Sequence, residues 1–411
     1  MRYTQKTIIL ESGERYVLLV DKDTGIPLYY PNLYITTQIR NRSLSLSAMS
    51  SALNGISILL EYLHTHYGKT PEKRFRVKDF LKIHELDAIR DFCQINHQKT
   101  KFNSNTKLVK LKDEKVSSAT EYIRLTEIAR YVRWLADQII DKTKDSTLTQ
   151  QIIKMEKGLK SRRPPKKYRN IETINKGLDS DQIELLLELT TPNSDYNPFL
   201  DVSVQKRNRV VILLLIYLGM RGGELLNLRI RDFDFSNNQV LIARRADEKD
   251  DPRKQQPLVK TLDRRLPIKN TLASEIHQYI INERRLIPNS NLHDYLIITH
   301  KSGPTQGQAI TIAGYRKIFE QIRSKYPMLQ NFTGHSLRHS WNESFSDKMD
   351  TMDTSFSEEK QEKIRSYLMG WREGSGTAAT YNKRFIKRKA NEASQKLQDG
   401  MIRLPKDLSD E

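Results

Sequence analysis

The sequence predicts a mostly α-helical protein with a small β-sheet, an α+β fold divided into two units. Three observations lead to this prediction. Apolar residues recur at helical spacing from about residue 45 to residue 160. A basic, proline-containing segment then interrupts the pattern, and further helical patterns with one short pair of strands follow it. At roughly 100 to 200 residues per domain, a chain of 411 residues has room for two or three domains.

The first unit is expected to begin with strands and continue with helices. Residues 1–44 are predicted as a small β-rich segment, because "TIILES", "RYVLLVD" and "GIPLYY" are separated by Gly- and Asp-containing turns. Residues 45–160 are predicted as a helical domain. Its first helix carries apolar residues at helical spacing and can end at Gly68, and "FRVKDFLKIHELDAIRDFCQ" and "ATEYIRLTEIARYVRWLADQIID" supply two more.

Residues 161–174 are interpreted as a basic linker. The stretch "KGLKSRRPPKKYRN" holds seven Lys and Arg, and its adjacent prolines disfavour a continuous helix. A solvated connector has this composition, and so does a segment that lies along a phosphate backbone; both descriptions can hold together. We therefore predict phosphate contacts from five side chains: Arg162, Arg163, Lys166, Lys167 and Arg169.

Residues 175–398 are predicted as a second, mostly α unit, and residues 399–411 as a frayed tail. "DSDQIELLLELT" opens this unit with an N-cap aspartate, and a pair of strands is expected near 239–268. The run "VVILLLIYLGM" at 210–220 indicates a buried helix, since it is too short to span a bilayer. No membrane association is expected, and "MRYTQKTIIL" at the start lacks the apolar core of a signal peptide.

The composition indicates a polyanionic partner. Lys and Arg number 69 against 50 Asp and Glu, which gives a formal net charge of +19 and a pI near 9.7. This balance is typical of proteins that bind nucleic acid, although a merely soluble basic protein can share it. Cys93 is the single cysteine, which excludes an internal disulfide and a multi-cysteine metal site. A reduced, cytoplasmic setting is expected.

The stretch "YLGMRGGELLNLRIRDFDF" at 217–235 places Arg221 at a helix junction. Gly219 and the pair Gly222–Gly223 break the apolar helix on either side of the arginine and allow its backbone to approach a ligand closely. The plainer alternative is a surface ion pair between Arg221 and Glu224.

The stretch "HSLRHSW" at 335–341 puts His335, Arg338 and His339 on one face of a helix. Histidines four residues apart can bind zinc, but Ser336 stands where a general-base Glu is usual, and Arg338 would set a fixed positive charge beside the ion. No metal site is therefore expected. A grip on a phosphate and a structural helix patch both remain open from this motif alone.

The stretch "YLMGWREGSGTAATYNKRF" at 367–385 combines Trp371, which follows a glycine, with Tyr381 ten residues later. A lone tyrosine is usually a core or rim residue. In a basic pocket, however, the phenol pKa falls from its usual value near 10 and the oxygen can act as a nucleophile.

Taken in chain order, these motifs resemble the site of the tyrosine recombinases of the phage integrase family. That family carries an Arg in a Gly-x-Arg-x-x-Glu stretch, a His-x-x-Arg motif, a His or Trp shortly after a glycine, and a tyrosine nucleophile. Arg221, His335, Arg338, Trp371 and Tyr381 match in identity and order. Each motif is weak alone, but four in order within a basic chain make a specific signal. The resemblance covers about residues 175–395.

The resemblance implies a domain plan and a reaction. Residues 175–398 would be the catalytic domain and residues 45–160 the helical core-binding domain, which together clamp DNA. The chain would be a site-specific DNA recombinase of the integrase or transposase type. It would cut and rejoin strands through a covalent 3′-phosphotyrosine, with neither metal, ATP nor another cofactor. Its partners would be double-stranded DNA, three further copies in a homotetramer on paired sites, and accessory recombination proteins, in the cytoplasm on the nucleoid.

The same resemblance assigns roles to the side chains. Tyr381 would attack the scissile phosphate, while Arg221 and Arg338 hold its non-bridging oxygens. His335 would assist proton transfer at the tyrosine or donate a hydrogen bond to the phosphate. Trp371 can only donate a hydrogen bond and would therefore be positional.

A hairpin lysine would protonate the leaving 5′-hydroxyl. Lys260 in "LVKTLDRRLPI" fits this role by its place before the apolar strand, with Lys249 and Lys254 as competitors. Glu224 and His339 would orient the arginine and the helix.

Other functions and several segments stay open at this level. A type IB topoisomerase would use much the same pocket, a non-catalytic DNA-binding protein would not need Tyr381, and a zinc hydrolase would use His335 and His339. The acidic stretch 346–363 is interpreted as a solvated loop, with a protomer contact as the alternative. Residues 1–44 could bind DNA or brace the helical domain, and the tail after Tyr381 could dock in cis or on a neighbour.

Overall fold

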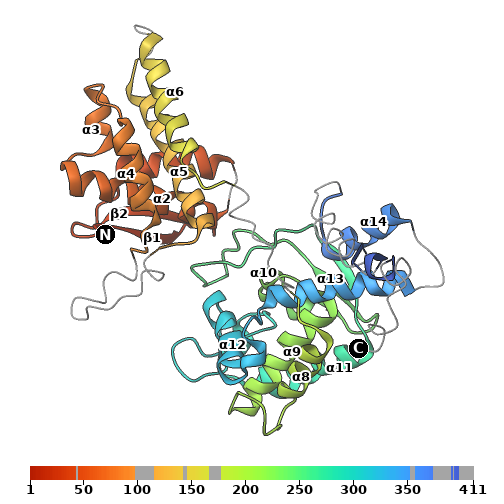
Figure 1. The fold of residues 1–411 in the computed structure, drawn as a ribbon. Coiled ribbons are helices and arrows are strands. Elements are labelled where there is room, and N and C mark those ends of the chain that lie inside the picture. Colours follow the sequence, from red (N-terminus) through yellow and green to blue (C-terminus); the bar gives the residue numbers. More distant parts are fainter. Residues whose placement is uncertain are drawn as a thin grey trace. The chain divides into compact units, whose positions relative to one another are not determined.

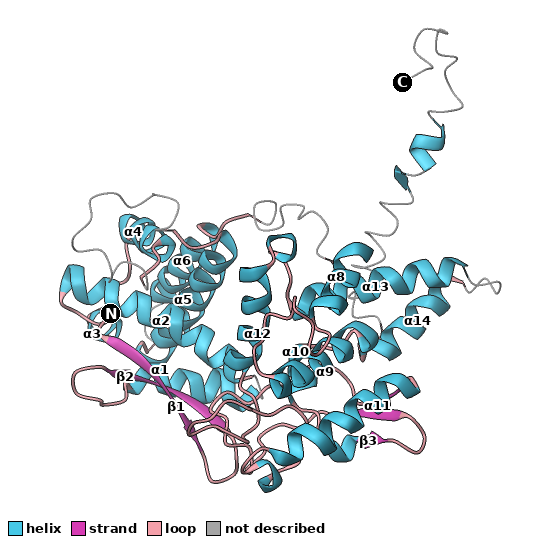
Figure 2. Cartoon of the chain, turned by 90° about the horizontal axis from the view of Figure 1, so that it is seen from below, coloured by secondary structure: helices cyan, strands magenta, loops and turns pink. Residues whose placement is uncertain are grey.

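The computed structural model describes residues 1–42, 45–97, 115–141, 146–165, 177–351, 357–373, 390–391 and 393–397. Two compact units make up the chain. The first contains Met1–Thr173 together with Asp247–Lys254, and the second contains Ile174–Ala246 and Gln255–Glu411. Helices dominate both units and the strands are short (Figures 1 and 2), which confirms the predicted α+β class.

The first unit opens with an antiparallel hairpin of β1 (Tyr3–Ile9) and β2 (Arg15–Asp21), in which Tyr3 pairs with Asp21 and Ile9 with Arg15. A short helical segment follows as α1 (Tyr29–Tyr34), a π-helical turn (Ile35–Ile39) and a 3₁₀ turn (Arg40–Arg42). The five main helical elements after it are α2 (Leu46–Tyr67), α3 (Pro71–Arg76), α4 (Ile83–Gln94), α5 (Ser118–Ile139) and α6 (Ser146–Ser161).

One apolar core joins the hairpin to the helices of the first unit. Val17 and Leu19 of β2 are fully buried in the same cluster as Leu53 of α2 and Leu125 of α5. Helix α5 packs against both α2 and α6. Residues 1–42 therefore share the core of the helices that follow them and do not form a separate body, which favours bracing over an independent role for this segment.

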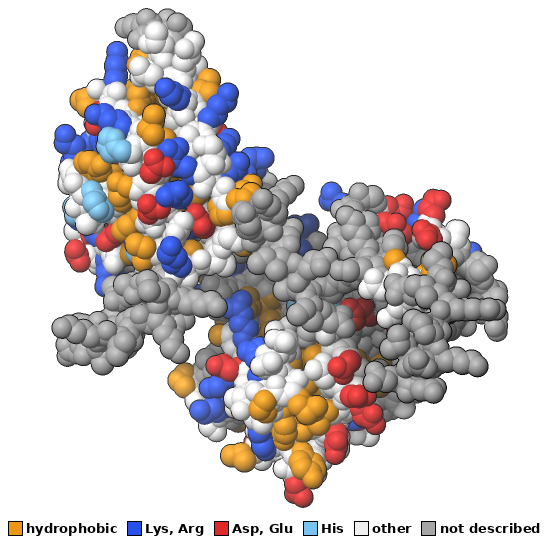
Figure 3. Space-filling view, in the orientation of Figure 1, with side chains coloured by type: hydrophobic (Ala, Val, Ile, Leu, Met, Phe, Trp, Pro, Cys, Tyr) orange, Lys and Arg blue, Asp and Glu red, His pale blue; other side chains and the backbone are white. Residues whose placement is uncertain are grey.

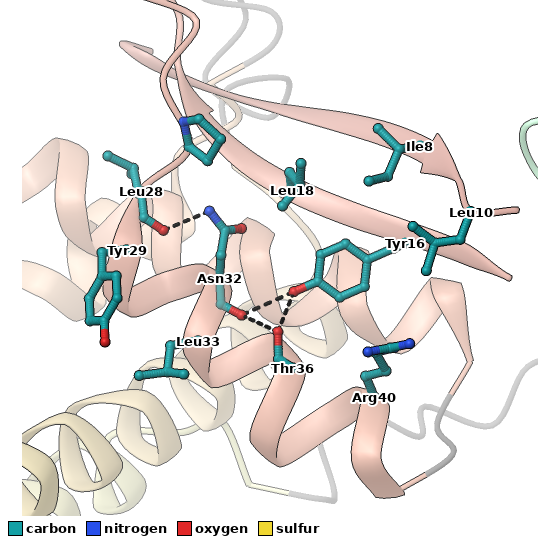
Figure 4. Close-up of a pocket in the computed structure, with 11 residues that line it drawn as sticks. Ile8, Leu10, Tyr16, Leu18, Leu28, Tyr29, Asn32, Leu33, Thr36 and Arg40 are labelled. Atoms are coloured by element: carbon teal, nitrogen blue, oxygen red, sulfur yellow. Dashed lines mark hydrogen bonds between the residues drawn. The ribbon is translucent and has the colours of Figure 1, made fainter.

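A pocket of about 550 Å³ lies between the hairpin and α1 (Figure 4). Its walls are apolar, and its polar groups bond to one another: the Tyr16 hydroxyl donates to the Asn32 carbonyl at 3.0 Å and contacts Thr36 Oγ1 at 2.7 Å (Figure 4). These bonds fix α1 to the hairpin.

Helix α2 is long and apolar enough to cross a membrane by length and composition alone. Of the apolar 18-residue window that gives this result, 61% is buried inside the protein. Its apolar side chains, among them Leu53, Ile56 and Leu59, form the centre of that unit's core, as expected for a core helix.

The segment Asp247–Lys254 belongs to the first unit although its neighbours in the chain belong to the second. The buried Arg15 guanidinium donates to the carbonyls of Glu248, at 2.7 Å, and Asp251. Within the segment, Arg253 pairs with Asp251 at 2.8 Å, and both side chains are buried. The sequence contains no sign of this association, because the bonded residues lie 236 positions apart.

The second unit is built around α9 (Val202–Leu218), whose side chains are buried on nearly every face. Helix α13 (Gly334–Thr351) packs against it (Figure 1). The predicted strand pair is present as β4 (Gln239–Ile242) and β5 (Arg264–Pro267), with β3 (Phe233–Asp234) completing an antiparallel sheet in the order β3-β4-β5. Further α-helices among the described residues of this unit are α8 (Ser180–Leu189), α10 (Gly222–Leu226), α11 (Asn270–Gln278), α12 (Ile312–Lys325) and α14 (Glu358–Met369).

The acidic stretch 346–363 is mostly helical where the structure describes it, so its interpretation as a loop is wrong there. Helix α13 continues through it to Thr351, and α14 begins at Glu358. Phe345 and Ser346 are buried, and the Ser346 hydroxyl accepts a hydrogen bond from Arg365 at 2.6 Å. The acidic composition reflects the solvent-facing side of helices that are anchored on their other side.

Candidate functional site

Arg221 stands at the joint between α9 and α10. Helix α9 ends at Gly219, whose φ of 56° is a left-handed conformation that favours glycine. Arg221 is the N-cap of α10, and its backbone N–H donates to Glu224 Oε2 at 2.9 Å. Its Nη1 is buried, lies 3.7 Å from Glu224 Oε1, and has no hydrogen-bond acceptor among the described residues. The Arg221 side chain is 32% exposed, so its guanidinium can donate to an anion that arrives from solvent.

Glu224 is the centre of the site's hydrogen bonds. Its carboxylate, 1% exposed, accepts from the Thr261 hydroxyl at 2.6 Å and from Arg264 Nη2 at 3.0 Å, besides the Arg221 amide. Burial alone would raise the pKa of Glu224, but Arg264 and Arg338 outweigh it, and the pKa lies below its usual value. This residue is thus a buried anion that ties together three chain segments, and the surface ion pair considered above does not describe it.

The connection between β4 and β5 is anchored on both sides of Lys260. Before Lys260, the side-chain amide of Asn227 donates to the Pro257 carbonyl, and Val259 is buried. After it, Thr261 binds Glu224, and the Leu262 amide donates to the Gly370 carbonyl at 2.9 Å. Lys260 itself is exposed between these anchors.

Lys249 and Lys254 belong to the segment Asp247–Lys254 of the first unit. Lys260 directly precedes Thr261, whose hydroxyl binds the Glu224 carboxylate that also accepts from the Arg221 amide.

Helix α13 carries the His-x-x-Arg motif. The Thr333 and Ser336 side chains each accept from the other's backbone amide, at 3.1 and 2.9 Å, and so define where the helix starts. Arg338 is 1% exposed and donates to the Gly219 carbonyl at 2.7 Å and to the Met369 carbonyl at 3.2 Å. One guanidinium therefore joins the end of α9 to the end of α14.

The two histidines of the motif lie side by side. His335 is exposed and His339 is half-buried, and their ring centroids are 4.5 Å apart in an edge-to-face arrangement. Among the residues that the structure describes, no group of three or more His, Cys, Asp or Glu side chains is placed to hold a metal ion.

Trp371 directly follows the end of α14 and lies against Arg338. Gly370 ends this helix with a φ of 63°, and the Trp371 amide donates to the Ser366 carbonyl at 2.8 Å. The indole is 6% exposed and lies 5.4 Å from the Arg338 guanidinium carbon, a cation–π arrangement. Tyr381, the predicted nucleophile, lies outside the described residues.

Residues 176–354 match the family model described as the phage integrase family. This stretch of the chain is similar to the phage integrase family. The matched stretch contains the joint at Arg221, the lysine segment and the His-x-x-Arg helix, while Trp371 and Tyr381 follow it.

Two curated relatives resemble part of this chain. The tyrosine recombinase XerD of Oceanobacillus iheyensis is 25% identical over 178 residues, which are 43% of this chain and 50% of that protein. The tyrosine recombinase XerC of Staphylococcus aureus is 27% identical over 141 residues, 34% of this chain and 40% of that protein. The chain spans about half the length of the curated relatives it matches.

A solved structure of the Tn1549 transposon integrase, in complex with circular intermediate DNA, has a TM-score of 0.51 with this chain at 16% identity. The match covers 86% of this chain and 94% of that one. At this identity the likeness shows a shared fold, and it extends beyond the stretch matched by the family model.

The predicted linker contacts divide into two groups. Arg162 pairs with Asp87 at 2.6 Å, and Arg163 donates to the Lys160 carbonyl at 2.9 Å with its guanidinium 4.7 Å from the Tyr122 ring centroid. Both arginines are thus engaged within the first unit. The other three, Lys166, Lys167 and Arg169, lie outside the described residues. On the visible face of the first unit, Lys and Arg side chains are scattered among apolar and acidic ones (Figure 3).

Sequence reasoning missed Arg264 and Thr261, which hold Glu224 in place. A signal for Arg264 was present: β5 reads Arg-Arg-Leu-Pro, and its buried positions are Arg264 and Leu266. Strand alternation puts these two on one face, so a charged residue in phase with a core leucine indicates a buried partner charge.

Proposed function

We propose that this chain is a site-specific DNA recombinase that cuts and rejoins strands through a covalent 3′-phosphotyrosine. The observation that carries the proposal is the Glu224 carboxylate, which ties the Arg221 backbone to Thr261, the neighbour of Lys260. Arg338 reaches the same joint through the Gly219 carbonyl. Groups that can neutralise, orient and protonate a phosphodiester thereby converge, although they come from segments far apart in the sequence.

The phosphate would be held by the two arginines. Arg221 offers a guanidinium whose Nη1 donor has no acceptor among the described residues, and Arg338 donates to two carbonyls at the joint. Guanidinium groups donate paired hydrogen bonds to non-bridging oxygens and stabilise the charge that develops on the pentavalent phosphorus. Trp371 stacks near Arg338 and would orient it.

In the cleavage step, the Tyr381 oxygen attacks the phosphorus, a P–O bond to tyrosine forms, and the P–O5′ bond breaks. Lys260 gives its proton to the departing 5′ oxygen, and the phenol proton leaves toward His335 or water. A 5′-hydroxyl from another strand then reverses the step. The phosphotyrosine conserves the bond energy, so the exchange requires no added nucleotide.

The partners and location follow from the same proposal. The substrate is double-stranded DNA with paired sites, bound by a homotetramer, with accessory recombination proteins as further partners. The protein would act in the cytoplasm, on the nucleoid. Residues 45–160 would serve as the core-binding domain that clamps the DNA together with the catalytic domain.

The decisive experiment traps the covalent intermediate. Repeats in the DNA that flanks the gene supply the candidate site, and a nicked duplex of that site releases the 5′ fragment so that rejoining cannot occur. We expect an adduct at Tyr381, lost in Tyr381→Phe and retained in Tyr367→Phe, which alters an exposed tyrosine on α14. An adduct at another residue would refute the assignment. Relaxation of plasmids that lack paired sites would instead indicate a topoisomerase.

A further inference from the structure

Tyr315 of α12 is a buried phenol at the centre of the catalytic unit. Its side chain is 9% exposed and packs edge-to-face with Phe319 at a centroid distance of 4.8 Å. The hydroxyl is buried and has no hydrogen-bond partner among the described residues. Burial raises the pKa of Tyr315, so the group is a neutral hydroxyl with a proton to donate.

This hydroxyl lies against the first residues of two functional helices. A side chain at Gly222, the first residue of α10, would place its Cβ 2.8 Å from the Tyr315 ring and 3.0 Å from the hydroxyl oxygen. A side chain at Gly334, the first residue of α13, would overlap the same hydroxyl. Arg221 directly precedes the one glycine and His335 directly follows the other.

The hydroxyl is unfavourable as a purely structural group. A buried O–H without a partner costs free energy, whereas phenylalanine would fill the same space without this cost. The hydroxyl lies between the backbone segments that carry Arg221 and His335. In the proposed reaction these two side chains move onto the bound phosphate, and the Tyr315 hydroxyl can find a hydrogen-bond acceptor in the rearranged segments.

We propose that Tyr315 is a positioning residue for strand cleavage, a role that rests on the proposed function. Its ring sets the spacing between the start of α10 and the start of α13. Its hydroxyl gains a hydrogen bond at this joint only when Arg221 and His335 engage the DNA phosphate. The bond therefore stabilises the cleavage-competent arrangement and not the free protein.

The first test removes only the oxygen. Tyr315→Phe should unfold at the same or a higher urea concentration than the unaltered protein, bind the duplex equally well, and form the phosphotyrosine adduct about tenfold more slowly, the factor expected for one lost hydrogen bond. A structural role would change unfolding and rate in the same direction. The matched control is Tyr326→Phe, at the end of the same helix, where the hydroxyl already donates to the Tyr196 carbonyl. It should unfold more easily and cleave at the normal rate.

The second test uses the contact with Gly334. Gly334→Ala should lower both urea resistance and cleavage rate, because its methyl group meets the hydroxyl. Adding Tyr315→Phe should restore part of the lost urea resistance, and the loss of rate in the double variant should be smaller than the two single losses combined. Additive losses would overturn the contact on which the inference depends. Equal adduct formation by Tyr315→Phe and the unaltered protein would overturn the positioning role alone, whereas no adduct from the unaltered protein would count against the proposed function.

Discussion

Glu224 and Arg264 form a buried ion pair at 3.0 Å, with side chains that are 0% and 1% exposed. They lie 40 positions apart in the chain, on α10 and β5. Arg264 also donates to the Leu368 carbonyl at 2.7 Å, so the pair links α10, the sheet and α14. The candidate site is thus organised around an ionised group that is itself fully buried.

Arg264→Met is expected to destabilise the catalytic unit strongly. The variant leaves the Glu224 carboxylate buried without its main countercharge, a change that costs about 3–5 kcal/mol of the free energy of unfolding. Urea unfolding monitored by tryptophan fluorescence measures this, since Trp341 and Trp371 belong to this unit. Lys363→Met removes an exposed partner of Glu359 and should leave the unfolding almost unchanged. Equal midpoints for the two variants would contradict the central position given to Glu224.

Stability should depend on pH through Glu224. Its pKa in the folded protein lies below the unfolded value, so its ionisation contributes stability above about pH 4.3, and this contribution is lost as the pH falls through the folded pKa. The difference in unfolding free energy between the unaltered protein and Glu224→Gln should be largest near neutral pH and shrink below pH 4.3. A difference that stays constant down to pH 3 would mean that the carboxyl is not a buried anion.

Lys260→Ala should cleave ordinary DNA about 10²–10⁴-fold more slowly, the usual range for a lost general acid. A duplex with sulfur in place of the bridging 5′ oxygen should restore the rate, because a thiolate leaves without being protonated. Lys249→Ala and Lys254→Ala should behave like the unaltered protein with both substrates. Sulfur rescue of Lys254→Ala instead would move the acid to that residue.

Arg338→Lys should cleave about 10²–10³-fold more slowly while the protein stays folded. A lysine ammonium cannot span the Gly219 and Met369 carbonyls and also present paired donors to a phosphate. Single-turnover cleavage gives the rate, and the thermal midpoint checks folding. Arg372→Lys, an exposed neighbour of Trp371, is the matched control. A loss of less than threefold at position 338 would argue against a paired grip on the phosphate.

The salt dependence of DNA binding should show which charged side chains of the basic linker contact DNA. Replacing Lys166, Lys167 and Arg169 together by Gln should reduce the slope of log K against log salt by about 2.7, at about 0.9 per phosphate contact. Arg162→Gln and Arg163→Gln should leave that slope nearly unchanged and lower the stability of the first unit, because these side chains bind Asp87, the Lys160 carbonyl and Thr126. The reverse pattern would show that the two arginines release their partners when DNA binds.

The site was predictable where function requires fixed residue types in a fixed order. Arg221 and Arg338 stand in short motifs, and Lys260 was a candidate because it lies just before the apolar strand that is now β5. The supporting contacts were not predictable in this way. Thr261 and Arg264 act through Glu224, and any residue with a matching donor could occupy their positions, so no short pattern marks them.

Local patterns gave the helices and strands, since α2, α5, α9 and the β4–β5 pair follow apolar periodicity. They failed where long-range packing decides. The acidic residues after Phe345 suggested a solvated loop. They lie on the exposed face of a helix, and composition alone does not reveal that the other face of this helix is buried.

The capture of Glu248 and Asp251 by Arg15 has a consequence for how the polypeptide is made. The first unit cannot be complete when residues 1–173 have left the ribosome, because its segment Asp247–Lys254 is still to be synthesised. Folding of the first unit is therefore completed only after Lys254 has been synthesised. A protease cut in the linker would leave residues Asp247–Lys254 of the second fragment bound to the first unit.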